Sequence, residues 1–285
     1  MSGYIEEALL LEVEGERLVG ILARPLQPAR RALIVVVGGP QYRVGSHRQF
    51  VLLARHLATS GIAVLRFDVR GMGDAEGEFP GFEALNPDIS AAVQGLRLAC
   101  PGVEQIALWG LCDGASAALM YVADERNPRV DALCLLNPWV RSAASLARTE
   151  VKHYYGQRLL SREFWAKLVS GRVNIAGALA ELFNKIRLAI ARPAHVPQHG
   201  FRERMAQAMK GYGGRILLVL SGRDFTAREF LDCAANEVTW TGLIEDPKVA
   251  RIDLSDSDHT FSTAVWRDAV ERATLDWLNG TAAHR

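Results

Sequence analysis

The chain has 285 residues, of which 49% are hydrophobic and 23% are charged, a composition typical of a globular protein with a large core. Its formal net charge is +1, so the overall charge does not favour nucleic acid or another polyanion as a partner. No basic stretch followed by an apolar one opens the chain, and no apolar run approaches ~20 residues, so we expect neither a signal peptide nor a membrane span.

The first predicted elements form an antiparallel hairpin. Residues 6–13 and 17–25 read as two strands joined by a turn at residues 14–16. A continuous apolar run at residues 31–39 follows and ends in glycines. Such a run predicts a central strand that is buried on both faces.

A helix is expected next. Ser46 and Gln49 have the spacing of a capping box, in which the serine hydroxyl and the glutamine side chain satisfy free backbone N–H groups. The helix should run to about Ser60, where Gly61 ends it.

Strands and helices then alternate along the chain. The predicted strands lie at residues 62–71, 104–112, 130–139, 214–224 and 248–256, and the predicted helices at residues 83–100, 114–124, 227–238 and 260–280. This order implies an α/β fold with a mostly parallel eight-stranded sheet and helices on both faces.

Residues 141–212 interrupt the alternation. They contain no strand-like apolar run and read as helices broken at glycines and prolines. We therefore expect a core made of residues 1–140 and 213–285, with a helical cap of residues 141–212 inserted between two late strands.

This segment is strongly basic. Residues 141–214 hold thirteen Lys or Arg and four Asp or Glu, a net charge of +9, which leaves −8 for the rest of the chain. Two interpretations are open: a solvated helical face, or a cap that attracts an anionic substrate.

A Gly-x-Cys-x-Gly motif joins the strand at 104–112 to the following alanine-rich helix. Gly110 and Gly114 flank Cys112, which suits a sharp turn that presents one side chain at the edge of a sheet. The start of a helix favours a thiolate there, and the backbone N–H of Asp113 would face a developing oxyanion. The alternative is a small buried cysteine in a tight turn.

His259 is the best candidate for a general base, because it follows the last predicted strand. Asp224, at the end of the strand before it, would orient the imidazole and gives the chain order Cys, Asp, His. Asp224 also fits the N-cap of the next helix and could serve both purposes. The other candidates for the group that orients the imidazole are Asp253, Asp256, Asp258 and, more weakly, the amide of Asn137.

These residues together resemble the α/β-hydrolase superfamily over nearly the whole chain. FDVRGMGDAEG at residues 67–77 is similar to a loop of peptidase- and esterase-like members, with Asp74 in the place of a serine. The combination of GGPQYR, SHRQF and GLCDGA resembles the hydrolase 1 family associated with the exosortase A system. That resemblance implies a cytoplasmic hydrolase of exopolysaccharide and protein-sorting gene clusters, without a cofactor. The cysteine in the turn is also similar to that of dienelactone hydrolase.

GGPQYRVGSHRQF at residues 38–50 falls where such enzymes carry their oxyanion loop. Pro40 stands at the position that would donate an N–H, and proline has none. Either Gln41 donates instead, or the loop is shifted towards Gly39.

The leading hypothesis is a hydrolase of ester or thioester bonds with a Cys112–His259–Asp224 triad and an acyl-enzyme intermediate. Its substrate would be a small or carrier-bound acyl compound, with an anionic group if the basic cap selects it. No metal is expected, because the four cysteines lack metal-ligand spacing and read as reduced thiols. The alternatives are an acyltransferase on the same scaffold and a catalytically inactive binding protein.

Overall fold

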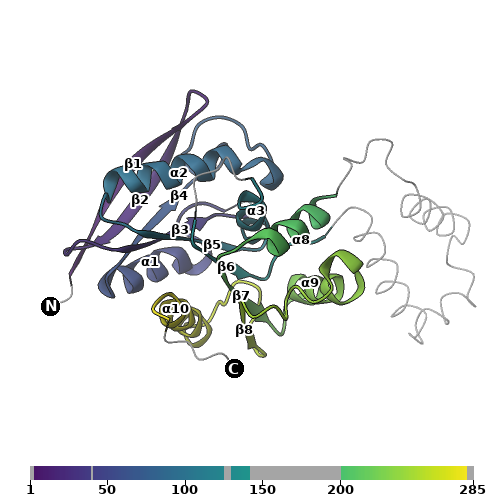
Figure 1. The fold of residues 1–285 in the computed structure, drawn as a ribbon. Coiled ribbons are helices and arrows are strands. Elements are labelled where there is room, and N and C mark those ends of the chain that lie inside the picture. Colours follow the sequence, from purple (N-terminus) through teal and green to yellow (C-terminus); the bar gives the residue numbers. More distant parts are fainter. Residues whose placement is uncertain (1–2, 40, 125–129, 142–199, 281–285) are drawn as a thin grey trace, which may run out of the picture. The chain divides into compact units, whose positions relative to one another are not determined.

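The computed structural model describes residues 3–39, 41–124, 130–141 and 200–280 (Figure 1). The chain divides into two compact units, Met1–Val140 with Phe201–Arg285, and Arg141–Gly200. Most of the predicted basic cap, from residue 142 to residue 199, lies outside the described residues.

The first unit is built on one sheet of eight strands. In chain order these are β1 (Tyr4–Val13), β2 (Glu16–Pro25), β3 (Arg31–Val36), β4 (Ile62–Phe67), β5 (Gln105–Leu111), β6 (Ala132–Leu136), β7 (Arg215–Ser221) and β8 (Val249–Leu254). Their spatial order is β1-β2-β4-β3-β5-β6-β7-β8. Only the pairs that include β2 are antiparallel among these strands. The arrangement confirms the predicted α/β-hydrolase fold.

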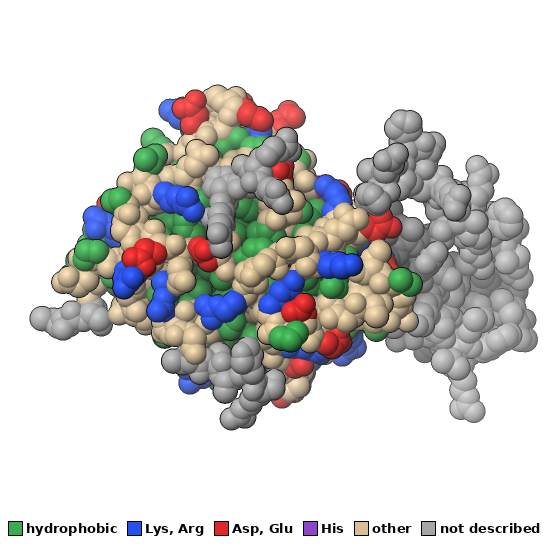
Figure 2. Space-filling view, in the orientation of Figure 1, with side chains coloured by type: hydrophobic (Ala, Val, Ile, Leu, Met, Phe, Trp, Pro, Cys, Tyr) green, Lys and Arg blue, Asp and Glu red, His purple; other side chains and the backbone are tan. Residues whose placement is uncertain are grey.

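Helices cover both faces of the sheet. They are α1 (Gln49–Thr59), α2 (Asn86–Ala99), α3 (Asp113–Tyr121), α8 (Phe201–Gly211), α9 (Phe225–Asn236) and α10 (Ala264–Leu278). Helices α1 and α2 lie on opposite faces of the sheet (Figure 1). Apolar side chains of α1 and α10 share one core layer, and those of α2, α3 and α8 share the other. On the face drawn in Figure 2, charged side chains of both signs lie intermingled.

The central strands are mostly apolar because both of their faces are covered. All residues of β4 and β6 are buried, whereas exposed positions recur along β1 and β8 at the edges. Strands β3, β5, β6, β7 and β8 run parallel, so their carboxyl ends meet at one edge. Every residue proposed above for chemistry follows one of these strand ends.

The predicted capping box at Ser46 is wrong. Ser46–Arg48 forms a 3-10 turn, and His47 and Arg48 are left-handed, with φ of 53° and 61°. The α-helix therefore begins only at Gln49, without a side-chain cap. The end of this helix was predicted correctly, because Gly61 has a φ of 88°.

Helix α8 belongs to the core rather than to the inserted segment. Met205 and Met209 are completely buried in the core layer that contains α3. The side chain of Arg202 donates to the carbonyl of Val140 and to Glu237, both at 2.5 Å. The core therefore resumes near residue 201, about one helix earlier than the predicted boundary at residue 213.

Candidate active site

Cys112 lies between β5 and α3 on a strained backbone. Its φ of 61° and ψ of −127° are rare for a residue with a side chain. The Cys112 N–H donates to the carbonyl of Leu136 at 2.9 Å, and the Cys112 carbonyl accepts from the N–H of Trp139 at 3.2 Å. These bonds to the segment at the end of β6 hold the turn in place. The turn has the form of a nucleophile elbow.

Glycines flank Cys112 because neighbouring backbone leaves no room for side chains. A Cβ atom on Gly110 would lie 2.4 Å from the carbonyl oxygen of Gly114. A Cβ atom on Gly114 would lie 2.4 Å from the carbonyl oxygen of Val36. Neither contact is possible without moving backbone, so the motif is required by the turn itself.

Asp224 and His259 lie together at the same edge. Nδ1 of His259 is 2.8 Å from Oδ2 of Asp224, although 35 residues separate them. Asp224 is also the N-cap of α9, where its oxygens accept from the N–H groups of Thr226 at 3.1 Å and Ala227 at 3.2 Å. The carboxylate thus has both of the roles considered for it.

His259 also lies beside the thiol. The hydrogen bond to Asp224 and the neighbouring Cys112 raise the pKa of His259 from its ordinary 6.5 to about 10, although burial acts in the opposite direction. The structure therefore places Cys112 beside an imidazole that is hydrogen-bonded to Asp224. This arrangement can activate a thiol and hold the imidazole that takes its proton.

The rival carboxylates point elsewhere. Asp253 pairs with Arg251 at 3.0 Å, and Asp256 pairs with Arg223 at 3.2 Å. Asp258 accepts from the N–H of Ser262 at 3.0 Å and also from its hydroxyl. Asp224 is the carboxylate that contacts the imidazole of His259.

Asn137, considered above as a weaker alternative to Asp224, has a structural role instead. Its side-chain amide donates to Oγ of Ser221 at 2.9 Å and to the carbonyl of His259 at 3.1 Å. Its Oδ1 accepts from the N–H of Ser221 at 2.9 Å. Asn137 is completely buried, so it joins the ends of β6 and β7 to the loop that carries His259.

The loop after β3 offers fewer backbone donors than expected. The N–H of Gln41 donates to the carbonyl of Gly39 at 2.8 Å, so it is not free for an oxyanion. The N–H of Gly39 faces the side-chain carboxyl of Asp113. The expectation that Gln41 replaces the missing proline donor is therefore not supported.

Arg43 anchors the same loop to the end of β4, a contact that the sequence did not predict. Its backbone N–H donates to Asp68 at 2.6 Å, and its guanidinium pairs with Asp68 and with Asp74. Asp68 is completely buried. The similarity of residues 67–77 to a hydrolase loop is the one signal that pointed to this network.

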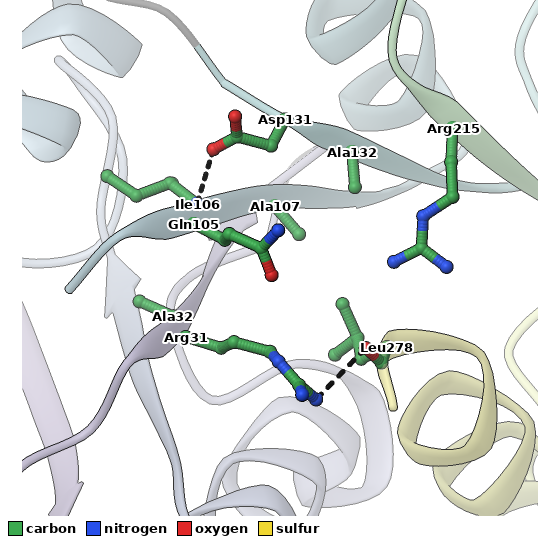
Figure 3. Close-up of a pocket in the computed structure, with 9 residues that line it drawn as sticks. All are labelled: Arg31, Ala32, Gln105, Ile106, Ala107, Asp131, Ala132, Arg215 and Leu278. Atoms are coloured by element: carbon green, nitrogen blue, oxygen red, sulfur yellow. Dashed lines mark hydrogen bonds between the residues drawn. The ribbon is translucent and has the colours of Figure 1, made fainter. Parts of the chain in front are cut away.

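A small cavity lies at the opposite edge, at the amino ends of the parallel strands (Figure 3). Arg31 donates to the carbonyl of Leu278 at 3.1 Å and to Oδ1 of Asn279 at 2.6 Å. Arg215 donates to the carbonyl of Trp277 at 3.2 Å. Both arginines thus hold the carboxyl end of α10, a structural role, and the cavity is separate from Cys112.

Within the described ranges, no three His, Cys, Asp or Glu side chains form a group that could hold a metal ion. In the same part of the chain, no helix is both long and apolar enough to cross a membrane.

A family model described as serine aminopeptidase, S33, matches residues 28–186. No curated protein sequence matches this chain.

Among solved structures, the esterase Pf2001 of Pyrococcus furiosus is similar, with a TM-score of 0.63, 14% identity and coverage of 98% of this chain and 91% of that one. Est1E of Butyrivibrio proteoclasticus, solved with ferulic acid, has a TM-score of 0.64, 17% identity and coverage of 96% and 99%. The α/β hydrolase GrgF of Penicillium sp. sh18 has a TM-score of 0.63, 20% identity and coverage of 97% and 99%. At these identities the likeness shows the fold.

Proposed function

Because the chain belongs to the serine aminopeptidase S33 family of hydrolases, we propose that it hydrolyses ester or thioester bonds with Cys112 as the nucleophile. The observation that carries this proposal is the position of Cys112, at a strained strand-to-helix turn, beside the imidazole of His259 that is hydrogen-bonded to Asp224. The family's name specifies serine, so the cysteine is the main departure of this chain.

In the proposed mechanism, His259 takes the proton of the Cys112 thiol, or already holds it in an imidazolium–thiolate pair, and the sulfur attacks the acyl carbonyl. The tetrahedral intermediate collapses when His259 returns that proton to the leaving oxygen or sulfur, which leaves an acyl-thioester on Cys112. Water then loses a proton to His259 and attacks the thioester. The acid departs, and the thiol is regenerated. Asp224 keeps the imidazole in the required orientation throughout.

The substrate is proposed to be an acyl group on a small molecule or a carrier, with a negative charge that the basic segment attracts. The resemblance to the exosortase-associated family supports a cytoplasmic role in an exopolysaccharide or protein-sorting pathway. An acyl-thioester also reacts readily with amines and thiols, so transfer to such an acceptor is the related alternative.

The second candidate is a hydrolase-like binding protein without activity. The hydrogen bond from the Gln41 N–H to the Gly39 carbonyl favours this second candidate, because it leaves the loop without an oxyanion donor at position 41. The two candidates differ in whether Cys112 becomes acylated.

The test uses p-nitrophenyl acetate with the intact protein and mass spectrometry of the products. The proposal predicts release of p-nitrophenol and an acetyl group on Cys112, both lost in Cys112→Ala. Turnover that persists in Cys112→Ala would remove the thiol from the mechanism. If Cys112 acquires no acetyl group, the binding-protein candidate is favoured instead.

A further inference from the structure

The side chain of Asp113 is a half-buried carboxyl next to Cys112 that has no part in the steps above. Its Oδ1 is shielded from solvent and makes no hydrogen bond within the described residues. A Cβ atom on Gly38 would lie 2.2 Å from this oxygen, so the carboxyl lies directly against the loop after β3. Buried polar atoms normally have a partner, and one without a partner calls for an explanation.

The same loop lacks donors where an oxyanion needs them. Position 40 is a proline and has no N–H, and the N–H of Gln41 is bonded to Gly39 at 2.8 Å. An oxyanion on Cys112 would therefore find the backbone N–H of Asp113, but no N–H from position 40 or 41. In this loop the Asp113 carboxyl faces the N–H of Gly39, and a carboxyl can carry a proton.

We propose that the Asp113 side chain, as a neutral carboxylic acid, donates a hydrogen bond to the oxyanion that forms at Cys112. It thereby replaces the backbone donor that Pro40 removes. No covalent bond is made or broken, since the proton stays on Asp113 throughout. This inference rests on the proposed function, because it needs acylation of Cys112.

Burial favours the neutral form. It is the largest influence on Asp113 and raises its pKa, while the N–H groups of Gly39, Asp113 and Gly114 lower it. The titratable group that acts on the carboxyl is His259 on the loop after β8, whose positive charge also lowers the pKa of Asp113. A protonated aspartate is an effective oxyanion donor in an apolar site, whereas an ionised one would repel the oxyanion.

The experiment measures the rate at which p-nitrophenyl acetate acylates Cys112, as a function of pH, in the parent protein and two variants. Asp113→Ala removes the donor and should lower the rate about 100-fold, as for other oxyanion donors. Asp113→Asn has an amide donor that does not titrate, so it should recover most of the loss. The ratio of the parent rate to the Asn rate should fall as pH rises, because the parent loses its donor when Asp113 ionises.

Glu104→Gln is the matched control. It removes an exposed carboxylate at the amino end of β5, where Glu104 pairs with Arg30 at 2.7 Å. Its pH profile should follow that of the parent.

Equal losses in the Ala and Asn variants would overturn the inference, as would a parent-to-Asn ratio that does not change with pH. A faster Ala variant would also overturn it, since the carboxyl would then block the site. If Asp113→Ala does not fold, the pH-dependent ratio alone decides. A parent protein that never acylates Cys112 refutes the proposed function first and the inference with it, whereas the other outcomes refute the inference alone.

Discussion

Asp224 Oδ2 lies 2.8 Å from Nδ1 of His259, and the same oxygen accepts from the N–H of Ala227 at 3.2 Å. One buried carboxylate therefore orients the imidazole and starts a helix. The two roles can be separated, because asparagine caps helices as well as aspartate does but cannot hold an imidazolium.

Asp224→Asn should lower turnover by up to about 10⁴-fold, because the amide does not stabilise the charged imidazole or its tautomer. Its stability should fall only by the contribution of the charged His259–Asp224 pair, because asparagine keeps the helix cap. Asp224→Ala should lose as much activity and, in addition, about 1 kcal/mol of unfolding free energy with the cap. Steady-state kinetics and urea unfolding of both variants check this. Equal stability of the two variants would show that the cap contributes nothing.

His259→Ala should cost at least ~100-fold in turnover, the lower end for general acid–base catalysis. The variant should also react more slowly with iodoacetamide at Cys112 near neutral pH, because the thiol loses the base that takes its proton. If the pH profile of alkylation were the same as in the parent, His259 would not be the partner of the thiol.

The stability of the protein should depend on the charge of His259. Its pKa rises from the ordinary 6.5 to about 10 in the folded state, mainly through Asp224. Folding then binds a proton, so this contribution is complete below pH 6.5 and is lost as pH rises to about 10. Unfolding free energies measured across this interval should fall more steeply in the parent than in His259→Gln. Parallel curves would contradict the raised pKa.

The four cysteines should react at different rates. Burial raises the pKa of Cys100 and of Cys134, and burial with Glu237 nearby raises that of Cys233 to about 12. Cys112 is half-buried and lies beside His259. Iodoacetamide at neutral pH should therefore modify Cys112 first, as peptide mapping would show.

The control is Cys112→Ser, which should keep the fold and lose the fast phase of alkylation. An equally fast reaction at Cys100 would contradict the expectation.

Asn137→Ala should destabilise the protein by about 1–3 kcal/mol, because it leaves buried groups of Ser221 and the His259 loop without partners. Turnover should fall as well, since the loop carries the proposed base. Asn236→Ala is a suitable control, because that exposed amide bonds only to the carbonyl of Asp232 in the described structure, at 2.7 Å. Its stability should change by less than ~0.5 kcal/mol. Similar losses in both variants would deny Asn137 any special role.

The sequence predicted most of the fold, because strand and helix periods and the order of elements are local signals. Cys112, Asp224 and His259 could be named because each follows a parallel strand, and such strand ends share one edge. The predicted start of the first helix failed because His47 and Arg48 adopt left-handed backbone in a loop that Arg43 fixes to Asp68. That bond joins residues 25 positions apart, and no local pattern encodes it. Helix α8 was misplaced for a similar reason, since its burial depends on α3.

The basic segment leads to a prediction about salt. If its net charge of +9 attracts anionic acyl donors, raising the salt concentration should lower kcat/KM for a negatively charged donor. Exposed charges act over roughly a Debye length, ~10 Å at 0.1 M salt, so the effect should be clear between low salt and 0.5 M. A neutral ester of similar size is the matched control and should hardly respond. Arg202 and Arg204 are poor choices for charge reversal, because each already pairs with a carboxylate, Glu237 and Glu83 respectively. Equal salt sensitivity of the two substrates would show that the charges of the basic segment form a solvated surface. The shape of the site alone would then select the substrate.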